Sequence, residues 1–135
     1  MQPPRRRRQE GLIREALYVF LAIAIVMAVL LDGLAIFTVQ QDARDDASDA
    51  GAEARRAYVE TGSVDAAREA AAGLVEANDA DLVAFSVSTA GRTGTFTVTV
   101  QHHADTYLFK YLAHLPGLDD WVEGVQNPTI TRTTD

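Results

Sequence analysis

Few residues in this chain have the types and spacing that metal binding or catalysis requires. His102 and His103 are adjacent, Asp105 lies two residues farther on, and His114 follows eleven residues after His103. Adjacent residues at the end of a strand point to opposite faces, so the two histidines do not readily bind one ion. The serines lie in no nucleophile motif (Ser48, Ser63, Ser86 and Ser88). We therefore expect neither a metal site nor a catalytic site.

The acidic run from Asp42 to Asp49 is the other candidate ion-binding segment. It lacks the glycine and the terminal glutamate of a calcium-binding loop, so we interpret it as the solvated face of a helix. The chain has no cysteine, which excludes thiolate zinc sites, and it has no glycine-rich phosphate loop. These observations predict a protein that is not an enzyme and that needs no cofactor.

The most informative element is an apolar run from Ala16 to Val39 that contains one charged residue. As a helix it would be about 36 Å long, enough to cross a hydrocarbon core of about 30 Å. A cleaved signal peptide is the alternative, but apolar character resumes after Asp32 and no small-x-small cleavage site follows directly. We therefore predict a single retained membrane anchor.

The charges on either side of this run predict its orientation. Five arginines precede it (Arg5 to Arg8 and Arg14), whereas the chain after Val39 has seven basic and sixteen acidic residues. By the positive-inside rule, residues 1–15 form a basic cytoplasmic tail, residues 16–39 a transmembrane helix and residues 40–135 an extracytoplasmic domain. The predicted location is the cell (inner, cytoplasmic) membrane.

The same charges limit the partners. A net charge of about −9 after Val39 argues against binding to nucleic acid, whose phosphates are bound by lysine and arginine. The arginine block is better explained by topology and by anionic membrane lipid.

Small residues continue beyond the anchor as a heptad seam with spacings of four, three, four and three: Ala43, Ala47, Ala50, Ala54 and Ala57. No proline or paired glycine interrupts the chain from Glu15 to Tyr58, which predicts one long helix. The seam permits the close approach of another helix, either the second helix of this chain or that of a partner subunit. Both readings are open at this point.

The remaining pattern predicts a small α+β domain. Gly62 is expected to end the long helix as a C-cap. Ser63 is expected to cap a second helix that ends near Ala77 and has one apolar stripe (Val64, Ala67, Ala71, Leu74 and Val75). Two runs with a period of two follow as a hairpin, with Val83, Phe85 and Val87 on one face of the first strand and Phe96, Val98 and Val100 on one face of the second. A third helix from Asp105 is expected to turn five side chains inward (Tyr107, Leu108, Tyr111, Leu112 and Leu115), and the segment TITRTT is expected to be an edge strand with Ile130 inward. The predicted order is helix, helix, strand, strand, helix, strand.

Asp32 is the charged residue within the apolar run. Burying a carboxylate there costs about 3 kcal/mol on insertion scales, so such residues usually face a partner or water. We expect an intramembrane contact with a partner at Asp32, and hydration by nearby headgroups is the alternative.

A family resemblance begins at Gly11 and Glu15, in the segment EGLIREALYVFLAIAIV. The chain resembles the TadE/TadG-like minor pilins of tight-adherence (Flp) pili, in which a basic tail leads to such a segment, then to an outward alanine-rich helix and a small α+β domain. The resemblance implies processing by a prepilin peptidase after Gly11 and a role for Glu15 in assembly. Here three residues separate Gly11 from Glu15 instead of four, and Arg14 occupies a normally apolar position. We therefore expect the N-terminus to remain uncut.

The resulting hypothesis is a non-enzymatic, single-pass, pilin-like subunit that assists assembly or stabilisation of a surface pilus or secretion apparatus. Its implied partners are other pilin-like or secretion-apparatus subunits, in a homo- or hetero-oligomer. The alternative is an anchored extracytoplasmic binding or accessory domain unrelated to pili.

Overall fold

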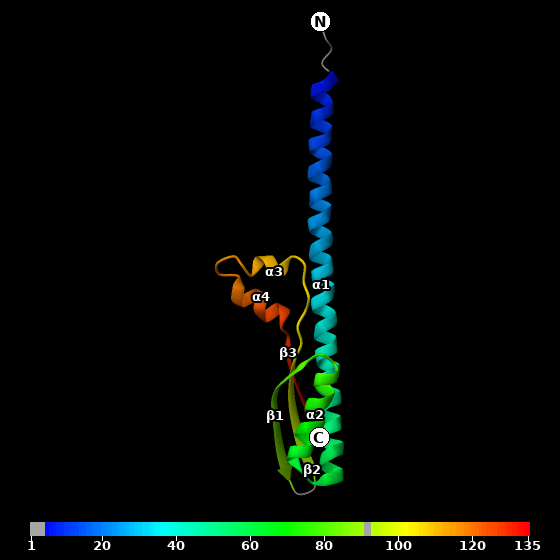
Figure 1. Ribbon diagram of the computed structural model, residues 1–135, viewed down its shortest axis with the longest axis vertical. Coiled ribbons are helices and arrows are strands. Elements are labelled where there is room, and N and C mark those ends of the chain that lie inside the picture. The colour runs from blue at the N-terminus through cyan, green and yellow to red at the C-terminus, as the bar shows by residue number, and fades with distance from the viewer. Residues whose placement is uncertain (1–4, 91–92) are drawn as a thin grey trace.

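One helix organises the whole molecule. The computed structural model describes residues 5–90 and 93–135, and its first element, α1, runs without interruption over Arg5–Thr61. Figure 1 shows its N-terminal half extending beyond the rest of the described chain, whereas the other elements gather along its C-terminal half. The helix is longer than the predicted span from Glu15 to Tyr58 because it begins within the arginine block, whose residues favour helix.

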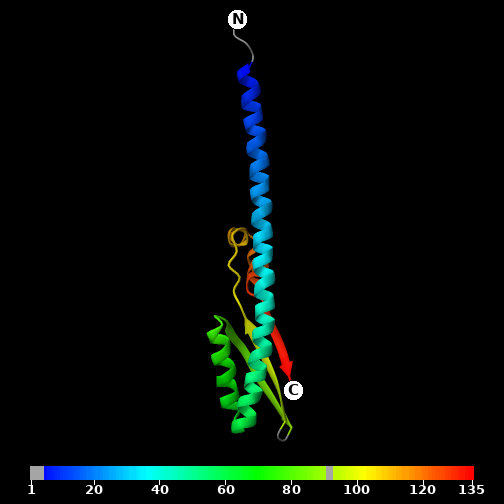
Figure 2. The ribbon, with the colours of Figure 1, turned by 90° about the vertical axis from the view of Figure 1, so that its right-hand side faces the viewer.

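The second helix, α2 (Val64–Ala77), packs antiparallel to the end of α1 in the manner of a helical hairpin (Figure 2). Gly62 has a positive φ of 70°, and its amide donates to the carbonyl of Tyr58 at 2.7 Å, so it ends α1 as a glycine C-cap. The Ser63 hydroxyl accepts a hydrogen bond from the amide of Ala66 at 3.3 Å and caps α2. Both predicted caps are confirmed.

A three-stranded antiparallel sheet completes the domain. Its strands β1 (Asp81–Ala90), β2 (Thr93–Gln101) and β3 (Thr129–Thr134) lie in the order β1-β2-β3, so the predicted hairpin and the predicted edge strand are both present. Threonine pairs on the exposed face bond across β2 and β3, including Thr99 with Thr131 at 2.9 Å. One face of the sheet is therefore exposed to solvent, as expected for an antiparallel sheet.

The core lies between the other face of the sheet and the two helices. It combines three alanines of α1, three small or branched residues of α2 and three residues of β2, all fully buried (Ala47, Ala50, Ala54, Ala67, Ala71, Val75, Phe96, Val98 and Val100). The rings of Tyr58 and Phe96 meet edge to face at a centroid distance of 5.6 Å. The small helix side chains let α1 and α2 approach closely, while the larger strand residues supply most of the buried volume.

One strand residue departs from the prediction. The pairing of β1 with β2 shifts between Leu82 and Ala84, so Val83 is the extra residue of a bulge and is 54 % exposed. Its neighbour Leu82 packs against the core instead. A bulge reverses the face on which the preceding side chains lie, and strict alternation cannot predict it.

The segment between β2 and β3 also differs from the prediction. In place of one helix from Asp105 it forms a single turn, α3 (Phe109–Leu112), and a second helix that was not predicted, α4 (Asp119–Gln126). Three of the five side chains expected to point inward are largely exposed (Tyr107, Tyr111 and Leu115), so that expectation was wrong. The rings of Phe109 and Trp121 meet edge to face at 5.8 Å and join the two short helices.

Candidate functional site

Asp32 connects the apolar half of α1 to the far end of the chain. Its Oδ1 accepts a hydrogen bond from the amide of Tyr107 at 2.6 Å. Its Oδ2 accepts hydrogen bonds from the amides of Leu108 at 2.6 Å and Phe109 at 2.9 Å. The side chain is fully buried. One carboxylate therefore pairs three consecutive amides that α3 leaves without intrahelical partners at its start.

The contacts of Asp32 in the structure differ in kind from those that the sequence led us to expect. The structure gives Asp32 contacts within the chain to Tyr107, Leu108 and Phe109. The expected contact with a partner subunit, or hydration by headgroups, stays a prediction. Backbone amides have no residue signature, and the two segments are more than 70 residues apart, so no local pattern could have identified this pair. Its physical effect is to fix α3 at one level along α1 (Figure 1).

The apolar surface of α1 before Asp32 is uncovered. Leu17, Phe20 and Leu30 are 63 %, 72 % and 61 % exposed, and both ribbon views show no other described element beside this part of the helix (Figures 1 and 2). Of the described helices, α1 is the one that is long and apolar enough to span a membrane. Gly11 and Glu15 lie exposed near the start of this surface.

The alanine seam lies inside the molecule. Ala43, Ala47, Ala50 and Ala54 are fully buried, and Ala57 is partly buried. Ala47, Ala50 and Ala54 share the core with residues of α2 and β2. The seam could pack on the second helix of this chain or on a partner subunit. In the structure it packs on the chain's own domain.

The two histidines have separate partners. The Nε2 of His102 lies 2.6 Å from a carboxylate oxygen of Asp46, whose other oxygen accepts a hydrogen bond from Asn78 at 2.6 Å. His103 Nδ1 lies 2.6 Å from the side-chain oxygen of Asn127. Among the described residues, no group of three potential ligands is arranged to hold a metal ion. Asp46 thus joins α1 to α2 and β2, and it is not the solvated acidic residue that the sequence indicated.

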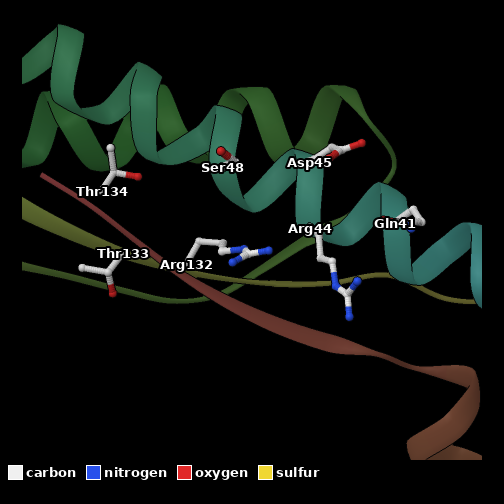
Figure 3. Close-up of a pocket in the computed structure, with 7 residues that line it drawn as sticks. All are labelled: Gln41, Arg44, Asp45, Ser48, Arg132, Thr133 and Thr134. Carbon is white, nitrogen blue, oxygen red and sulfur yellow. The ribbon is translucent and has the colours of Figure 1, made fainter.

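A shallow pocket of about 410 Å³ lies between α1 and β3. Figure 3 shows Arg44 from the helix and Arg132 from the strand extending into the space between them, with Asp45, Ser48 and Thr134 nearby. Both arginines are exposed. The guanidinium groups could donate hydrogen bonds to a carboxylate of another molecule. Among the hydrogen bonds of the described residues, Ser48 has none with a histidine or a carboxylate that could act as a base.

Comparisons with protein-family models, with curated proteins and with solved structures each found no match to this chain. The class of protein is therefore defined by its architecture. It is a mixed α+β protein with a long apolar N-terminal helix and a small domain built on a three-stranded antiparallel sheet.

Proposed function

We propose that the protein is a single-pass membrane subunit, resembling TadE-like minor pilins, that assists assembly or stabilisation of a surface pilus or secretion apparatus. The observation that supports this most is the division of α1. Its first half exposes apolar side chains such as Phe20 and Leu30, and its second half is buried against the domain at Ala47 and Ala54. A helix of this kind can be held in lipid and can also pack against the helices of neighbouring subunits.

The hydrogen bonds to Asp32 support the same proposal. Hydrogen bonds from Tyr107 and Leu108 hold the domain to the helix at the end of its free half, beyond the contacts made by the core. The domain and the anchor then move as one body, so a force or a contact at one is transmitted to the other. That property suits a subunit whose position in an assembly is set by its membrane helix.

An anchored binding domain is the second candidate, and the pocket between Arg44 and Arg132 is the observation that favours it. A pocket of this kind suits an exposed acidic group. It is open and polar, however, and ligand sites are usually concave and largely apolar with a few polar groups. We therefore give the assembly function precedence.

Membrane topology is the first test, and the chain suits it because it has no cysteine. We would introduce one cysteine at Ser88, in the hairpin farthest from the anchor, or at Gln9, in the basic tail. The proposal expects a membrane-impermeant maleimide to label Ser88→Cys in intact cells and Gln9→Cys only after lysis. The reverse labelling would contradict the topology.

The assembly role is tested by deleting the gene in the source organism. Surface appendages detached by shearing, and proteins released into the medium, would be compared between the parent, the deletion strain and the complemented strain. The proposal expects loss or shortening of appendages, or loss of secretion, with rescue by the wild-type chain and by Arg132→Ala. Rescue by the wild-type chain but not by Arg132→Ala would favour the binding domain.

A further inference from the structure

The segment around α3 exposes an unusual set of side chains. Tyr107 and Tyr111 are 67 % and 66 % exposed, and Leu115 and Leu118 in the following turn are 48 % and 39 % exposed. The Lys110 ammonium lies 6.0 Å from the ring centre of Tyr107 and 5.2 Å from that of Tyr111. We call these five residues the interfacial patch. Their exposure needs an explanation, since clustered exposed apolar residues usually mark an interaction surface.

The position of the patch along α1 indicates what covers it. The amides of Tyr107, Leu108 and Phe109 bind Asp32, so α3 lies at the level of Asp32, near the end of the exposed apolar surface of α1, which continues past Asp32 to Leu34 and Phe37. Figure 1 shows α3 as the part of the domain nearest to the free half of α1. It runs across the axis of α1, and Figure 2, turned by 90°, shows it end-on. A helix across the anchor lies parallel to the plane of a membrane that the anchor crosses.

The length of the free half fits this placement. From Leu12 to Leu31 the helix has 20 residues and rises about 30 Å, which equals the thickness of a typical hydrocarbon core. A span with these limits lies closer to the N-terminus than the one predicted over residues 16–39, and it puts Asp32 at the outer boundary. Near the inner boundary, Arg14 and Glu15 are within reach of headgroups because charged side chains extend toward water.

The composition of the patch suits a lipid interface. Tyrosine and lysine are favoured at headgroup level, because each combines an apolar stem or ring with a polar end. Between Thr106 and Leu118 there is no acidic residue, and Lys110 is the one residue with a full charge at pH 7. The acidic residues resume at Asp119 and Asp120 in α4, which Figure 1 places on the side of α3 away from the free half of α1.

We propose that the interfacial patch docks on the outer leaflet of the bilayer, and that the hydrocarbon span of α1 ends at Asp32. The proposal rests on the membrane anchoring proposed above and adds a second membrane contact from the far end of the chain. Asp32 is the positioning residue of this contact. The Asp32 carboxylate also accepts hydrogen bonds from the backbone amides of a short irregular segment. At a depth where water is scarce, such amides need an acceptor within the protein.

A neighbouring subunit is the competing occupant of the patch. Continuity with the exposed apolar surface of α1 favours lipid, since Tyr107 binds Asp32, which lies within that surface between the exposed Leu31 and Leu34. The two occupants differ in one measurable respect. Lipid contact persists when the protein is diluted in excess lipid, whereas contact with a second copy does not.

The test uses tryptophan fluorescence, because Trp121 is the one tryptophan in the chain. In a Trp121→Phe background, the full chain would carry a single tryptophan in place of Tyr111, reconstituted at high lipid excess into phosphatidylcholine and phosphatidylglycerol vesicles. Acyl chains brominated near the headgroup or near the bilayer centre serve as quenchers of known depth. The proposal predicts blue-shifted emission and stronger quenching by the shallow bromines.

Two further variants in the same background act as controls. Phe20→Trp lies in the anchor and should be quenched by the deep bromines, and Ser88→Trp in the distal hairpin should not be quenched. A quenched Phe20→Trp with an unquenched Tyr111→Trp would overturn the interfacial proposal and leave the anchor intact. An unquenched Phe20→Trp would overturn the anchor itself and with it the proposed function.

Adding Asp32→Ala to the Tyr111→Trp variant tests the positioning role. The proposal predicts loss of most of the shallow quenching, because α3 is no longer fixed at this depth, while Phe20→Trp with Asp32→Ala remains quenched. Unchanged quenching of Tyr111→Trp would contradict the role of Asp32. A third outcome is blue-shifted emission of Tyr111→Trp without quenching, which returns to red-shifted emission when the ratio of lipid to protein is raised further. This outcome would assign the patch to a second copy of the chain and overturn the proposal.

Discussion

The Asp32 carboxylate accepts a 2.6 Å hydrogen bond from the amide of Leu108, which lies 76 residues later in the chain. The bond joins the free apolar half of α1 to the start of α3, and two neighbouring amides bind the same carboxylate. The region around α3 has little core of its own, with Val122 the fully buried residue of its two short helices. The position of this region therefore depends on Asp32 more than on hydrophobic packing.

Replacing Asp32 by alanine should loosen residues 105–126 while the sheet stays folded. Three amides lose their acceptor, and a buried unpaired amide costs about 1–3 kcal/mol. Hydrogen exchange of the full chain in lipid nanodiscs measures this effect, with faster exchange expected at Tyr107, Leu108 and Phe109 and unchanged exchange in β2. Asp42→Ala, an exposed change on the same helix, is the matched control. Equal exchange in the two variants would show that Asp32 does not hold the segment.

Enlarging the buried seam should destabilise the domain. Ala54 of α1 is fully buried in the core with residues of α2 and β2, so Ala54→Leu forces side chains apart and should cost about 1–3 kcal/mol. Ala52→Leu adds the same atoms at an exposed position and should change stability by less than about 0.5 kcal/mol. Denaturant unfolding of the full chain in detergent, followed by near-ultraviolet circular dichroism, compares the two. If they unfold at the same midpoint, the seam is not packed as described.

Two glycines in helices should respond differently to replacement by alanine. A Cβ at Gly51 would lie 2.5 Å from the Thr134 hydroxyl, whereas a Cβ at Gly73 meets nothing within 4 Å. Gly73→Ala should stabilise the protein by about 0.5–1 kcal/mol through helix propensity. Gly51→Ala should stabilise the protein by less than Gly73→Ala does, or destabilise it. Combining Gly51→Ala with Thr134→Ala should restore the stability that the contact with Thr134 removes. Equal midpoints for the two single variants would contradict the close packing of β3 on α1.

The pair of histidines offers a test of the contact between α1 and β2. His102 lies 2.6 Å from Asp46 and its side chain is 11 % exposed, whereas His103 is exposed and contacts Asn127. His102→Ala leaves Asp46 without that partner and should lower the free energy of unfolding by about 1–3 kcal/mol. His103→Ala should have a smaller effect. A larger loss at His103 would mean that the contact with Asp46 contributes little.

The N-terminus of the protein in membranes is a further prediction. Because the spacing between Gly11 and Glu15 is one residue shorter than in the pilins it resembles, we expect the chain to begin at Met1 or Gln2. Intact mass measurement of membrane-isolated protein tests this. A chain starting at Leu12 would show processing after Gly11 and strengthen the resemblance, and a chain starting beyond Val39 would show a cleaved signal peptide and remove the anchor.

The features that the sequence predicts well are those encoded by local periodicity. The spacing of Ala47, Ala50 and Ala54 identifies the packed face of α1, and the alternation of Phe96 and Val98 identifies the buried face of β2. These patterns follow directly from 3.6 residues per helical turn and two per strand repeat. Local chemistry at Gly62 and Ser63 likewise identifies where one helix ends and the next begins.

The features that the sequence does not predict depend on distant contacts. Val83 is exposed because of a bulge whose position is set by pairing with β2. Tyr107 and Tyr111 have the spacing of a buried helical stripe, but their segment binds Asp32 and forms a single turn in which both rings are exposed. The Asp32 site itself consists of one side chain and three amides, and amides are present at every residue except proline.

The most direct test of the central claim is cross-linking in living cells through α1. The chain has no cysteine, so Phe20→Cys and Leu34→Cys each place one thiol on its exposed apolar surface, and Ser88→Cys places one on the distal hairpin as a control. The cells of the source organism would then be oxidised. If the protein is a subunit of a membrane assembly, the thiols at positions 20 and 34 should form disulfide adducts. The partners would be copies of the same chain, or other single-helix subunits that carry a cysteine at the same depth. Adducts should be absent or rare at Ser88. If neither Phe20→Cys nor Leu34→Cys forms an adduct while an impermeant maleimide still labels Ser88→Cys, the helix is an anchor alone, and its proposed role in assembly is wrong.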